Sequence, residues 1–571
     1  MKDVAEASFN EIVSPAGTQF IIPIWQRLYS WEYKELNDLW EDLMKIHERL
    51  RKGESAEHFL GPIVIKTVEE KVGEITRRVL IDGQQRLTTL LLICALIRDK
   101  AKAEGNERLA NEIEDSLLFN KYAKKIEDKP KLRPTEADRR LFDLIINGER
   151  LEAPSEGSQL YFAYNVFKDL LETSKDKYDM DTLLDCIKKL KIVTIRLDER
   201  DNPNRIFETL NFRGRELAQS DLVRNYFMMA IRDAIKANQI YNDIWFPMQQ
   251  GLGPNTSERI QNLEAFLRHY IVMNKHKFVK ENQVYAEIRE RLKDSSEDQV
   301  ISELNRIRKY SQYYERLLCP GKEENAKIAK EIEHLDRLKI GVYYPFLLRV
   351  YDAFNSADRK IDEDDFCNIL RIIESYIVRR LFHQLPTNSL NRLFASLCGL
   401  AEDDLVASLQ KELAEKEEWR AQYWPKDDEF KEDFQTVPMY KISPQRCRFV
   451  LETLEESFMH PEAIRLEGLT IEHIMPETLT QEWKNYLGKD WENTYNRYLN
   501  TIGNLTLVAG PPNVAIGNKL LGEKKEEWYK YSNVELTKEI AKKWDEWTQA
   551  QIKERAENLA ERAVRIWARP K

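Results

Sequence analysis

Two short apolar segments separated by a long polar stretch constrain the C-terminal part of this chain more than any other feature. The first covers residues 469–476 and contains His473, and the second covers residues 503–508. Each has the length of a short strand, and Gly503 permits a tight turn into the second. A lysine-rich segment follows Asn513 and predicts a helix. The predicted order is strand, strand and helix, with a histidine ending the first strand and an asparagine starting the helix.

The polar residues of this arrangement are those that a metal-dependent nuclease needs. His473 could take a proton from water if its ring is fixed and the scissile phosphate is activated. Glu472 and Asn513 supply oxygen ligands for a hard cation, Mg²⁺ or Mn²⁺. The amide of Asn504 could hold the backbone of the loop after His473. A lone histidine is more often structural, and Asn513 could simply cap a helix, but the ordered set favours a nuclease.

Length and composition exclude several classes of protein. A chain of 571 residues is too long for one core, so two to four domains are expected. A hydrophobic content of 42% with 32% charged residues is typical of a globular protein. The first residues lead into no apolar signal region, and no apolar run approaches about 18 residues, which predicts a cytoplasmic protein without membrane contact. Six scattered cysteines without a CxxC pair argue against disulfides and zinc.

The pattern of apolar residues divides the chain into three predicted regions. In residues 1–235 short apolar strands alternate with helices, as in an α/β or α+β domain. Residues 236–430 are predicted to be helical, and residues 431–571 contain the strand–strand–helix segment. The charged stretch 412–436 predicts a hinge or an exposed helix. The expected fold class is multidomain α+β, predominantly helical. The predicted helices of the middle region are 260–273, 282–292, 301–318, 326–351 and 366–385.

A second group of polar residues follows the apolar strand 79–81. Asp82 and Gly83 end this strand, and an apolar helix is expected to start near Thr88. Free N–H groups at the start of that helix, with Arg86 beside them, would bind an anion, while Asp82 could hold a cation or position water. A plain turn with Thr88 as the N-cap is the structural alternative. The segment contains no Walker A sequence, so a P-loop enzyme is not predicted.

Several N-terminal motifs and one C-terminal block resemble the GmrSD-type, modification-dependent (Type IV) restriction endonucleases. The resemblance is clear over residues 8–230 and 445–570 and weak in between. It implies a ParB/sulfiredoxin-like N-terminal domain and a C-terminal ββα-metal (HNH) nuclease domain. The motifs that carry it lie at 22–31, 58–65, 82–90 and 205–225, and the C-terminal block lies at 470–547.

The resemblance also implies an activity and a set of residues. In this family the N-terminal domain binds and hydrolyses nucleoside triphosphate, and the C-terminal domain cuts modified double-stranded DNA of phage or other foreign origin. His473 would then be the general base, Glu472 and Asn513 the ligands of Mg²⁺, and Asn504 the residue that orients the histidine loop. Glu472 departs from the pattern, because many HNH enzymes carry Asp there. The implied nucleotide-site residues are Asp82, Gln84, Gln85, Arg86, Gln26 and Arg27.

The net charge of −9 requires that any DNA-binding surface be confined to one face. Candidate basic residues are Lys519, Lys524 and Lys525, although interleaved glutamates fit a solvated helix equally well. Two other functions stay open: a nucleotide-switched DNA-binding or regulatory protein whose HNH domain does not cut, and a non-hydrolytic scaffold. The sequence leaves open the DNA modification, the preferred triphosphate and a homodimer.

Overall fold

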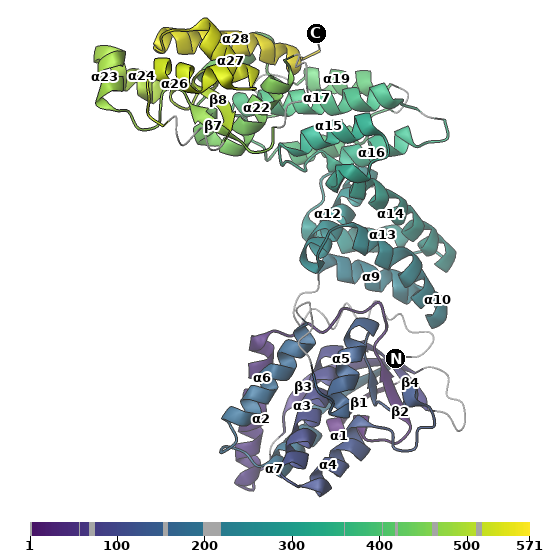
Figure 1. The fold of residues 1–571 in the computed structure, drawn as a ribbon. Coiled ribbons are helices and arrows are strands. Elements are labelled where there is room, and N and C mark those ends of the chain that lie inside the picture. The colour runs from purple at the N-terminus through teal and green to yellow at the C-terminus, as the bar shows by residue number, and fades with distance from the viewer. Residues whose placement is uncertain are drawn as a thin grey trace. The chain divides into compact units, whose positions relative to one another are not determined.

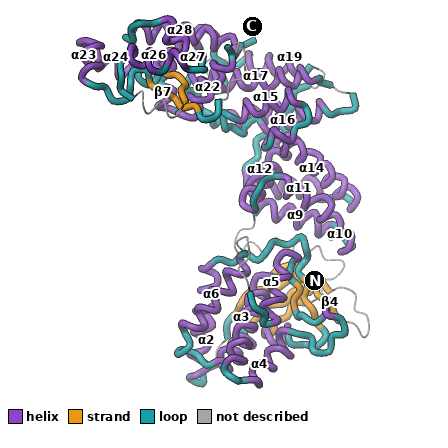
Figure 2. The backbone as a smooth tube through the Cα atoms, viewed as in Figure 1, coloured by secondary structure: helices purple, strands orange, loops and turns teal. Residues whose placement is uncertain are grey.

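A computed structural model describes residues 3–55, 57–67, 75–151, 158–197, 218–358, 360–401, 404–416, 421–458, 466–509 and 517–570. Within these ranges the chain is mostly helical, with one mixed and one antiparallel sheet (Figures 1 and 2). The expected α+β, predominantly helical class is therefore confirmed. The chain forms two compact units: unit 1 is Met1–Gln250 with Tyr285–Arg308, and unit 2 is Gly251–Val284 with Lys309–Lys571. Helices of the predicted middle region occur in both units, and the predicted boundaries at 235 and 430 stay predictions.

Unit 1 is built on a six-stranded mixed sheet with the strand order β1-β6-β3-β4-β2-β5. β2 runs parallel to β4 and β5, and β3 runs parallel to β6, whereas the pairs β1–β6 and β3–β4 are antiparallel. The carboxyl ends of β2, β4 and β5 therefore meet at one edge of the sheet, the usual position of a ligand in such sheets. The strands are β1 Asp3–Ser8, β2 Thr18–Ile21, β3 Phe59–Thr67, β4 Thr76–Asp82, β5 Leu132–Arg133 and β6 Lys191–Leu197.

Helices α1 to α7 share one hydrophobic core with this sheet. The longest of them, α3, is buried along most of its length because nearly all its side chains from Leu87 to Ile97 are apolar. These helices are α1 Phe9–Val13, α2 Tyr33–Arg51, α3 Gln84–Ala103, α4 Glu107–Ile113, α5 Glu136–Asn147, α6 Gln159–Thr173 and α7 Met180–Lys189. Unit 1 also contains α9 Gln219–Ala230, α10 Ala234–Ile240, and all but one residue of each of α11 Phe246–Gly251 and α13 Val284–Leu292.

The middle of the chain is helical as predicted, with one correction. The expected helix 326–351 is two helices, α15 and α16, because Pro345 lacks the N–H that a continuous helix would need there. Pro345 instead occupies the first turn of α16, where that N–H has no partner in any case. The helices are α12 Thr256–Lys275, α14 Glu297–Leu318, α15 Ala326–Asp336, α16 Tyr344–Phe354, α17 Glu363–Phe382, α18 Leu390–Leu397 and α19 Leu405–Ala414.

The C-terminal part of unit 2 contains a two-stranded antiparallel sheet of β7 Leu469–His473 and β8 Leu505–Ala509. The stretch 412–436 is not simply exposed, because Phe430 and Phe434 of α20 are fully buried. Tryptophans from the segment between β7 and β8 and from the segment between α27 and α28 form one core here, which includes Trp483 and Trp547. The helices are α20 Asp427–Thr436, α21 Met439–Ile442, α22 Pro444–Glu456, α23 Gln481–Leu487, α24 Trp491–Tyr498, α26 Leu521–Glu527, α27 Glu535–Lys543 and α28 Gln549–Ile566.

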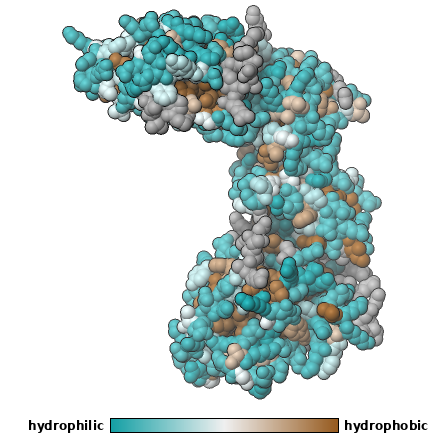
Figure 3. All heavy atoms as spheres, viewed as in Figure 1, coloured by the Kyte–Doolittle hydropathy of each residue, from teal (hydrophilic) through white to brown (hydrophobic). Residues whose placement is uncertain are grey.

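The surface directs the search for a functional site toward buried polar groups. On the face drawn in Figure 3 most side chains are hydrophilic, and hydrophobic ones are scattered among them. No helix in the described ranges is long and apolar enough to cross a membrane. All six cysteines are free, and all except Cys319 are buried.

Candidate functional site

His473 is the last residue of β7 and lies opposite Leu505 of β8. Its side chain is buried, with Nε2 at 3.4 Å from Oδ1 of Asn500. The ring of Tyr440 meets the imidazole edge-on, with centroids 4.6 Å apart and planes at 89°. Burial lowers the pKa of His473 and outweighs the opposing effects of the Glu477 carboxylate and of Asn500. The imidazole is therefore neutral near pH 7, which is the form that a general base needs.

Asn504 holds the loop that follows His473. Its Oδ1 accepts a hydrogen bond from the N–H of Met475 at 2.8 Å, and its Nδ2 donates to the carbonyl of the same residue at 3.0 Å. The indole N–H of Trp547 donates to the same Oδ1 at 3.0 Å. Asn504 is completely buried, so these bonds are shielded from water. This is the contact with the histidine loop that the sequence predicted for Asn504.

Helix α28 braces the turn into β8. A Cβ atom on Gly503 would lie 2.5 Å from the carbonyl oxygen of Ile552, so only glycine allows this approach. The buried Arg555 donates from Nη1 to the carbonyls of Ile502, Gly503 and Leu505 at 2.7–3.2 Å. The position of Asn504 is thus fixed by the C-terminal helix as well as by the sheet.

Glu472 forms a buried ion pair with Lys524. The ammonium donates to Oε1 of Glu472 at 2.7 Å and to the carbonyls of His473 and Ile474 at 3.1 and 3.0 Å. Burial raises the pKa of Glu472 and lowers that of Lys524, and the attraction between the two groups opposes both shifts. Lys524 thus neutralises the carboxylate next to the candidate base and ties down the same loop.

This finding corrects the interpretation of the lysines as one exposed face. Lys524 is completely buried, and Lys525 donates to the Trp544 carbonyl at 2.7 Å and to Asp545 at 2.8 Å. Both ammonium groups serve internal contacts, so neither is available to a phosphate in this structure. Lys519 precedes α26, remains partly exposed and pairs with Glu527.

The described donors do not complete a metal site. Asn513 lies outside the described residues, and Glu472 already accepts the ammonium of Lys524. Within the described ranges no three His, Cys, Asp or Glu side chains are grouped so that they could hold a metal. Lys524 already uses Oε1 of Glu472, so an ion at this carboxylate would lie close to the ammonium charge.

In unit 1, Asp82 ends β4 at the edge where the parallel strands terminate. Helix α3 begins at Gln84 rather than near Thr88, because Gly83 adopts a φ of 92° and acts as its N-cap. A Cβ atom at Gly83 would lie 2.5 Å from Ile63, so the close approach also requires glycine. Burial raises the pKa of Asp82, opposed by the charges of Arg86 and Arg27 and by the N–H of Gly83. The carboxylate of Asp82 therefore lies near two arginines and the N-terminus of α3.

Two of the glutamines predicted for nucleotide binding hold the protein's own backbone. Nε2 of Gln26 donates to the carbonyls of Leu80 and Ile81 at 3.2 and 2.8 Å. Gln85 accepts from the N–H of Ser30 at 2.9 Å and donates to the Leu28 carbonyl at 3.2 Å. These bonds fasten the loop 26–31 to β4 and α3.

The other predicted residues of this site keep polar groups nearby. Arg86 donates to the Pro62 carbonyl at 2.8 Å. The buried Oε1 of Gln84 has no hydrogen-bond partner among the described residues. The signature at 205–214 lies outside the described residues.

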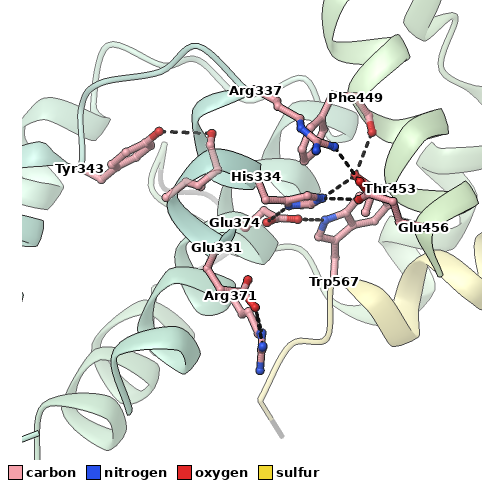
Figure 4. Close-up of polar contacts among 11 residues, drawn as sticks. Glu331, His334, Arg337, Tyr343, Arg371, Glu374, Phe449, Thr453, Glu456 and Trp567 are labelled. Atoms are coloured by element: carbon pink, nitrogen blue, oxygen red, sulfur yellow. Dashed lines mark hydrogen bonds and ion pairs between the residues drawn. The ribbon is translucent and has the colours of Figure 1, made fainter. Parts of the chain in front are cut away.

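The half-buried His334 lines a cavity of about 220 Å³ in unit 2. Figure 4 shows its polar contacts. Nδ1 of His334 lies 2.7 Å from Glu374, and Nε2 lies 3.2 Å from Glu456. The indole of Trp567 donates to the second oxygen of Glu374 at 2.7 Å. Burial lowers the pKa of His334, but the bonds to the two glutamates outweigh it and raise the pKa to about 9. The imidazolium joins α15, α17, α22 and the end of α28, which indicates a structural role.

Sequence analysis missed Tyr440, Asn500 and the pairing of Lys524 with Glu472. Asn500 is four residues before Asn504, but no spacing rule marks it. Tyr440 lies outside the strand–strand–helix segment altogether.

Two regions of the chain match known protein families. Residues 9–228 match the N-terminal domain of the GmrSD restriction endonucleases, and residues 424–562 match the C-terminal domain. A search of curated proteins finds no match to this chain. The first match contains the Asp82 site and the second contains His473, so both sites fall inside the matched domains.

These matches define the class of protein as a restriction endonuclease, whose substrate is DNA. The chain carries both domains in order and belongs to the GmrSD family. The resemblance inferred from the sequence motifs is confirmed.

Proposed function

We propose that this chain is an NTP-regulated, Mg²⁺-dependent HNH endonuclease that cuts modified foreign DNA, such as phage DNA, in the cytoplasm. The observation that carries the proposal is the neutral, buried imidazole of His473 at the end of β7, followed by a loop that Asn504 clamps. The proposal includes a ββα-metal fold for the C-terminal domain and a ParB/sulfiredoxin-like fold for the N-terminal domain.

The proposed reaction is hydrolysis of a phosphodiester. His473 removes a proton from water as the water oxygen attacks phosphorus, and the bond from phosphorus to the leaving oxygen breaks. Asn504 keeps the loop, and with it the imidazole, in place throughout. The carbonyls of His473 and Ile474, held by Lys524, fix the same loop from the other side.

The metal is proposed to be Mg²⁺ or Mn²⁺, held by Glu472 and Asn513. Oxygen ligands suit such hard cations, and a bound ion would neutralise charge that develops on the phosphate. Lys524 already bonds to Oε1 of Glu472, so the ion would bind through Oε2 or would displace the ammonium from Oε1.

The proposed nucleotide site lies at the carboxyl ends of β2, β4 and β5. Arg86, Arg27 and the N-terminus of α3 would attract the phosphates, and Asp82 would hold a cation or water. Gln84 offers an oxygen without a partner among the described residues, whereas Gln26 and Gln85 shape the site through the loop 26–31.

Of the three candidate lysines, Lys519 remains partly exposed and is proposed to contact DNA. The aromatic residues between β7 and β8 supply packing, since Trp483 and Tyr498 lie in the core. A homodimer is compatible with the proposal. The DNA modification and the preferred triphosphate are to be found by experiment.

One observation favours the second candidate, a nucleotide-switched DNA-binding protein that does not cut. The carboxylate proposed to hold the metal is already neutralised by Lys524. If that pair never opens, the C-terminal domain would bind DNA without cleaving it.

The test is a cleavage assay on unmodified, glucosylated-hydroxymethylcytosine and phosphorothioate DNA, with and without NTP. Each reaction is run with Mg²⁺, with Mn²⁺ and with EDTA. We expect cutting of at least one modified DNA, a response to NTP, loss of activity in EDTA, and no stoichiometric zinc in the purified protein. Binding of DNA without cutting under every condition would support the second candidate.

A further inference from the structure

The side chain of His473 is held by two residues that no family match or sequence motif singles out. We infer that Asn500 and Tyr440 are positioning residues that hold the imidazole with its hydrogen on Nε2, so that Nδ1 is the atom that accepts the proton. The inference rests on the proposed function, because it assigns the acceptor atom within that reaction.

The contact with Asn500 decides which ring nitrogen carries hydrogen. Oδ1 of Asn500 can only accept a hydrogen bond, and it faces Nε2 of His473 at 3.4 Å. A neutral imidazole carries one hydrogen, so a donor at Nε2 leaves the lone pair on Nδ1. Hydrogen bonds around a catalytic base are often long before substrate binds and shorten in the reacting complex.

Tyr440 restricts the ring from a second direction. Its aromatic ring meets the imidazole at 89° with centroids 4.6 Å apart, an edge-to-face packing that disfavours rotation of the imidazole. The backbone N–H of Tyr440 also donates to the carbonyl of Asn500 at 3.2 Å. Short helix α21 and the segment after α24 therefore meet at the same point as the end of β7.

The contact between Nε2 of His473 and Asn500 supports the reaction as well as the position of the ring in the resting protein. When Nδ1 takes the proton from water, the imidazole becomes positively charged while Nε2–H stays on Asn500. A hydrogen bond from a charged donor is stronger than one from a neutral donor, so the contact stabilises the imidazolium more than the imidazole. Asn500 thus supports proton transfer while the new P–O bond forms and the leaving P–O bond breaks.

The side chain of Asn500 can be removed without cutting its link to α21, because that link uses the backbone carbonyl. Asn500→Ala is therefore expected to keep the fold and DNA affinity but to lose about 10- to 100-fold in single-turnover cleavage, the effect of one hydrogen bond to a charged group. Asn500→Asp keeps an acceptor at the same place, but its added negative charge favours the protonated form of His473. Most of the rate should therefore be restored at alkaline pH, where the imidazole is neutral again. Asn493→Ala on α24, whose amide bonds only Asp490 among the described contacts, is the matched control.

Two further variants separate positioning from general packing. Tyr440→Phe keeps the ring and should cut as wild type does, whereas Tyr440→Leu should be slower. In a His473→Ala background, Asn500→Ala should cause no additional loss, because its effect passes through the imidazole.

A measurement on the resting protein makes the inference independent of cleavage. Histidine-selective ¹⁵N NMR of the full chain, with the signal of His473 identified by its absence in His473→Ala, should show hydrogen on Nε2. The Asn500→Ala variant should show a mixture of tautomers.

If wild type cuts no DNA but the NMR signals behave as expected, the proposed function fails and the positioning contact stands. The inference is overturned if His473 carries its hydrogen on Nδ1, or if Asn500→Ala cuts as fast as wild type. It is also overturned if Asn500→Asp is as slow as Asn500→Ala.

Discussion

Two histidines of unit 2, the buried His473 and the half-buried His334, differ in charge near neutral pH. His334 lies between the carboxylates of Glu374 and Glu456, and its pKa is raised to about 9. His473 follows a glutamate in the chain, yet its pKa is lowered by burial. The difference is that His334 bonds directly to two carboxylates, whereas His473 contacts the amide of Asn500 and the uncharged ring of Tyr440, and the charge of Lys524 lowers its pKa further.

The comparison shows how neighbouring charges decide what a buried histidine can do. A permanently protonated imidazole can bridge helices, as His334 does, but has no lone pair with which to accept a proton. A neutral imidazole such as His473 can act as a base but contributes little to electrostatic stability. The following predictions test the parts of this contrast, beginning with the largest expected effect.

The first prediction concerns Lys524, whose charge lies between Glu472 and the loop after His473. Lys524→Ala leaves Glu472 buried without its cation and should lower the free energy of unfolding by about 3–5 kcal/mol. The double variant Lys524→Met with Glu472→Leu removes both charges and should recover much of that loss. Denaturation followed by tryptophan fluorescence measures both. Equal stability of wild type and Lys524→Ala would show that the pair is not formed in solution.

The second prediction concerns the structural role of His334. His334→Leu removes charge-assisted bonds to two glutamates and should cost about 2 kcal/mol of unfolding free energy, since such bonds contribute about 1.5–3 kcal/mol and Glu456 is partly exposed. The same denaturation experiment gives the value. If His334→Leu lowers the free energy of unfolding no more than an ordinary surface substitution does, His334 does not stabilise the fold through the network in Figure 4.

The same histidine predicts a pH dependence of stability. Its folded pKa of about 9 lies above the ordinary value of 6.5, so its contribution is complete below pH 6.5 and is lost as pH rises through about 9. Wild type should therefore lose stability between these values relative to His334→Leu. Parallel stability curves for the two proteins would contradict the raised pKa.

The smallest free-energy effect, a change in how cleavage responds to nucleotide, is expected in unit 1, where two arginines lie near the buried carboxylate of Asp82. Asp82→Ala should abolish NTP hydrolysis and the response of cleavage to NTP, through a coupling of at least about 1 kcal/mol, or about 5-fold. NTP should speed cleavage if it binds the cutting-competent state more tightly, and should slow cleavage if it binds the resting state more tightly. Cleavage of modified DNA is measured against NTP concentration for both proteins. Identical curves would mean that the Asp82 loop is structural.

Local features were predictable from the sequence, and long-range pairings were not. The strand that ends at His473 and the contact of Asn504 with its loop follow from short-range patterns in residues 469–476 and 503–508. The pairing of Lys524 with Glu472 spans 52 residues, and lysines are rarely buried, so charge patterning predicted an exposed face. In the same way, the resemblance implied that Gln85 binds nucleotide, and its bond to the backbone of Ser30, 55 residues away, could not be predicted.

Helix boundaries failed where a single residue overrides periodicity. Apolar spacing continues through residues 326–351, but Pro345 starts a new helix. Helix α3 starts at Gln84, earlier in the chain than the predicted Thr88, because the left-handed conformation of Gly83 ends the strand directly before it. Both candidate sites lie at the ends of strands, where backbone geometry and not periodicity sets the position of the side chains.

The most direct test of the account is the cleavage rate per folded molecule of His473→Ala and His334→Ala, measured with the modified DNA that wild type cuts. The account predicts that His473→Ala keeps its stability and DNA affinity but cuts about 10²- to 10⁴-fold more slowly, the usual contribution of a general base. His334→Ala should be less stable, yet its folded fraction should cut as wild type does. Near-normal cutting by a folded His473→Ala protein would contradict the assignment of the base.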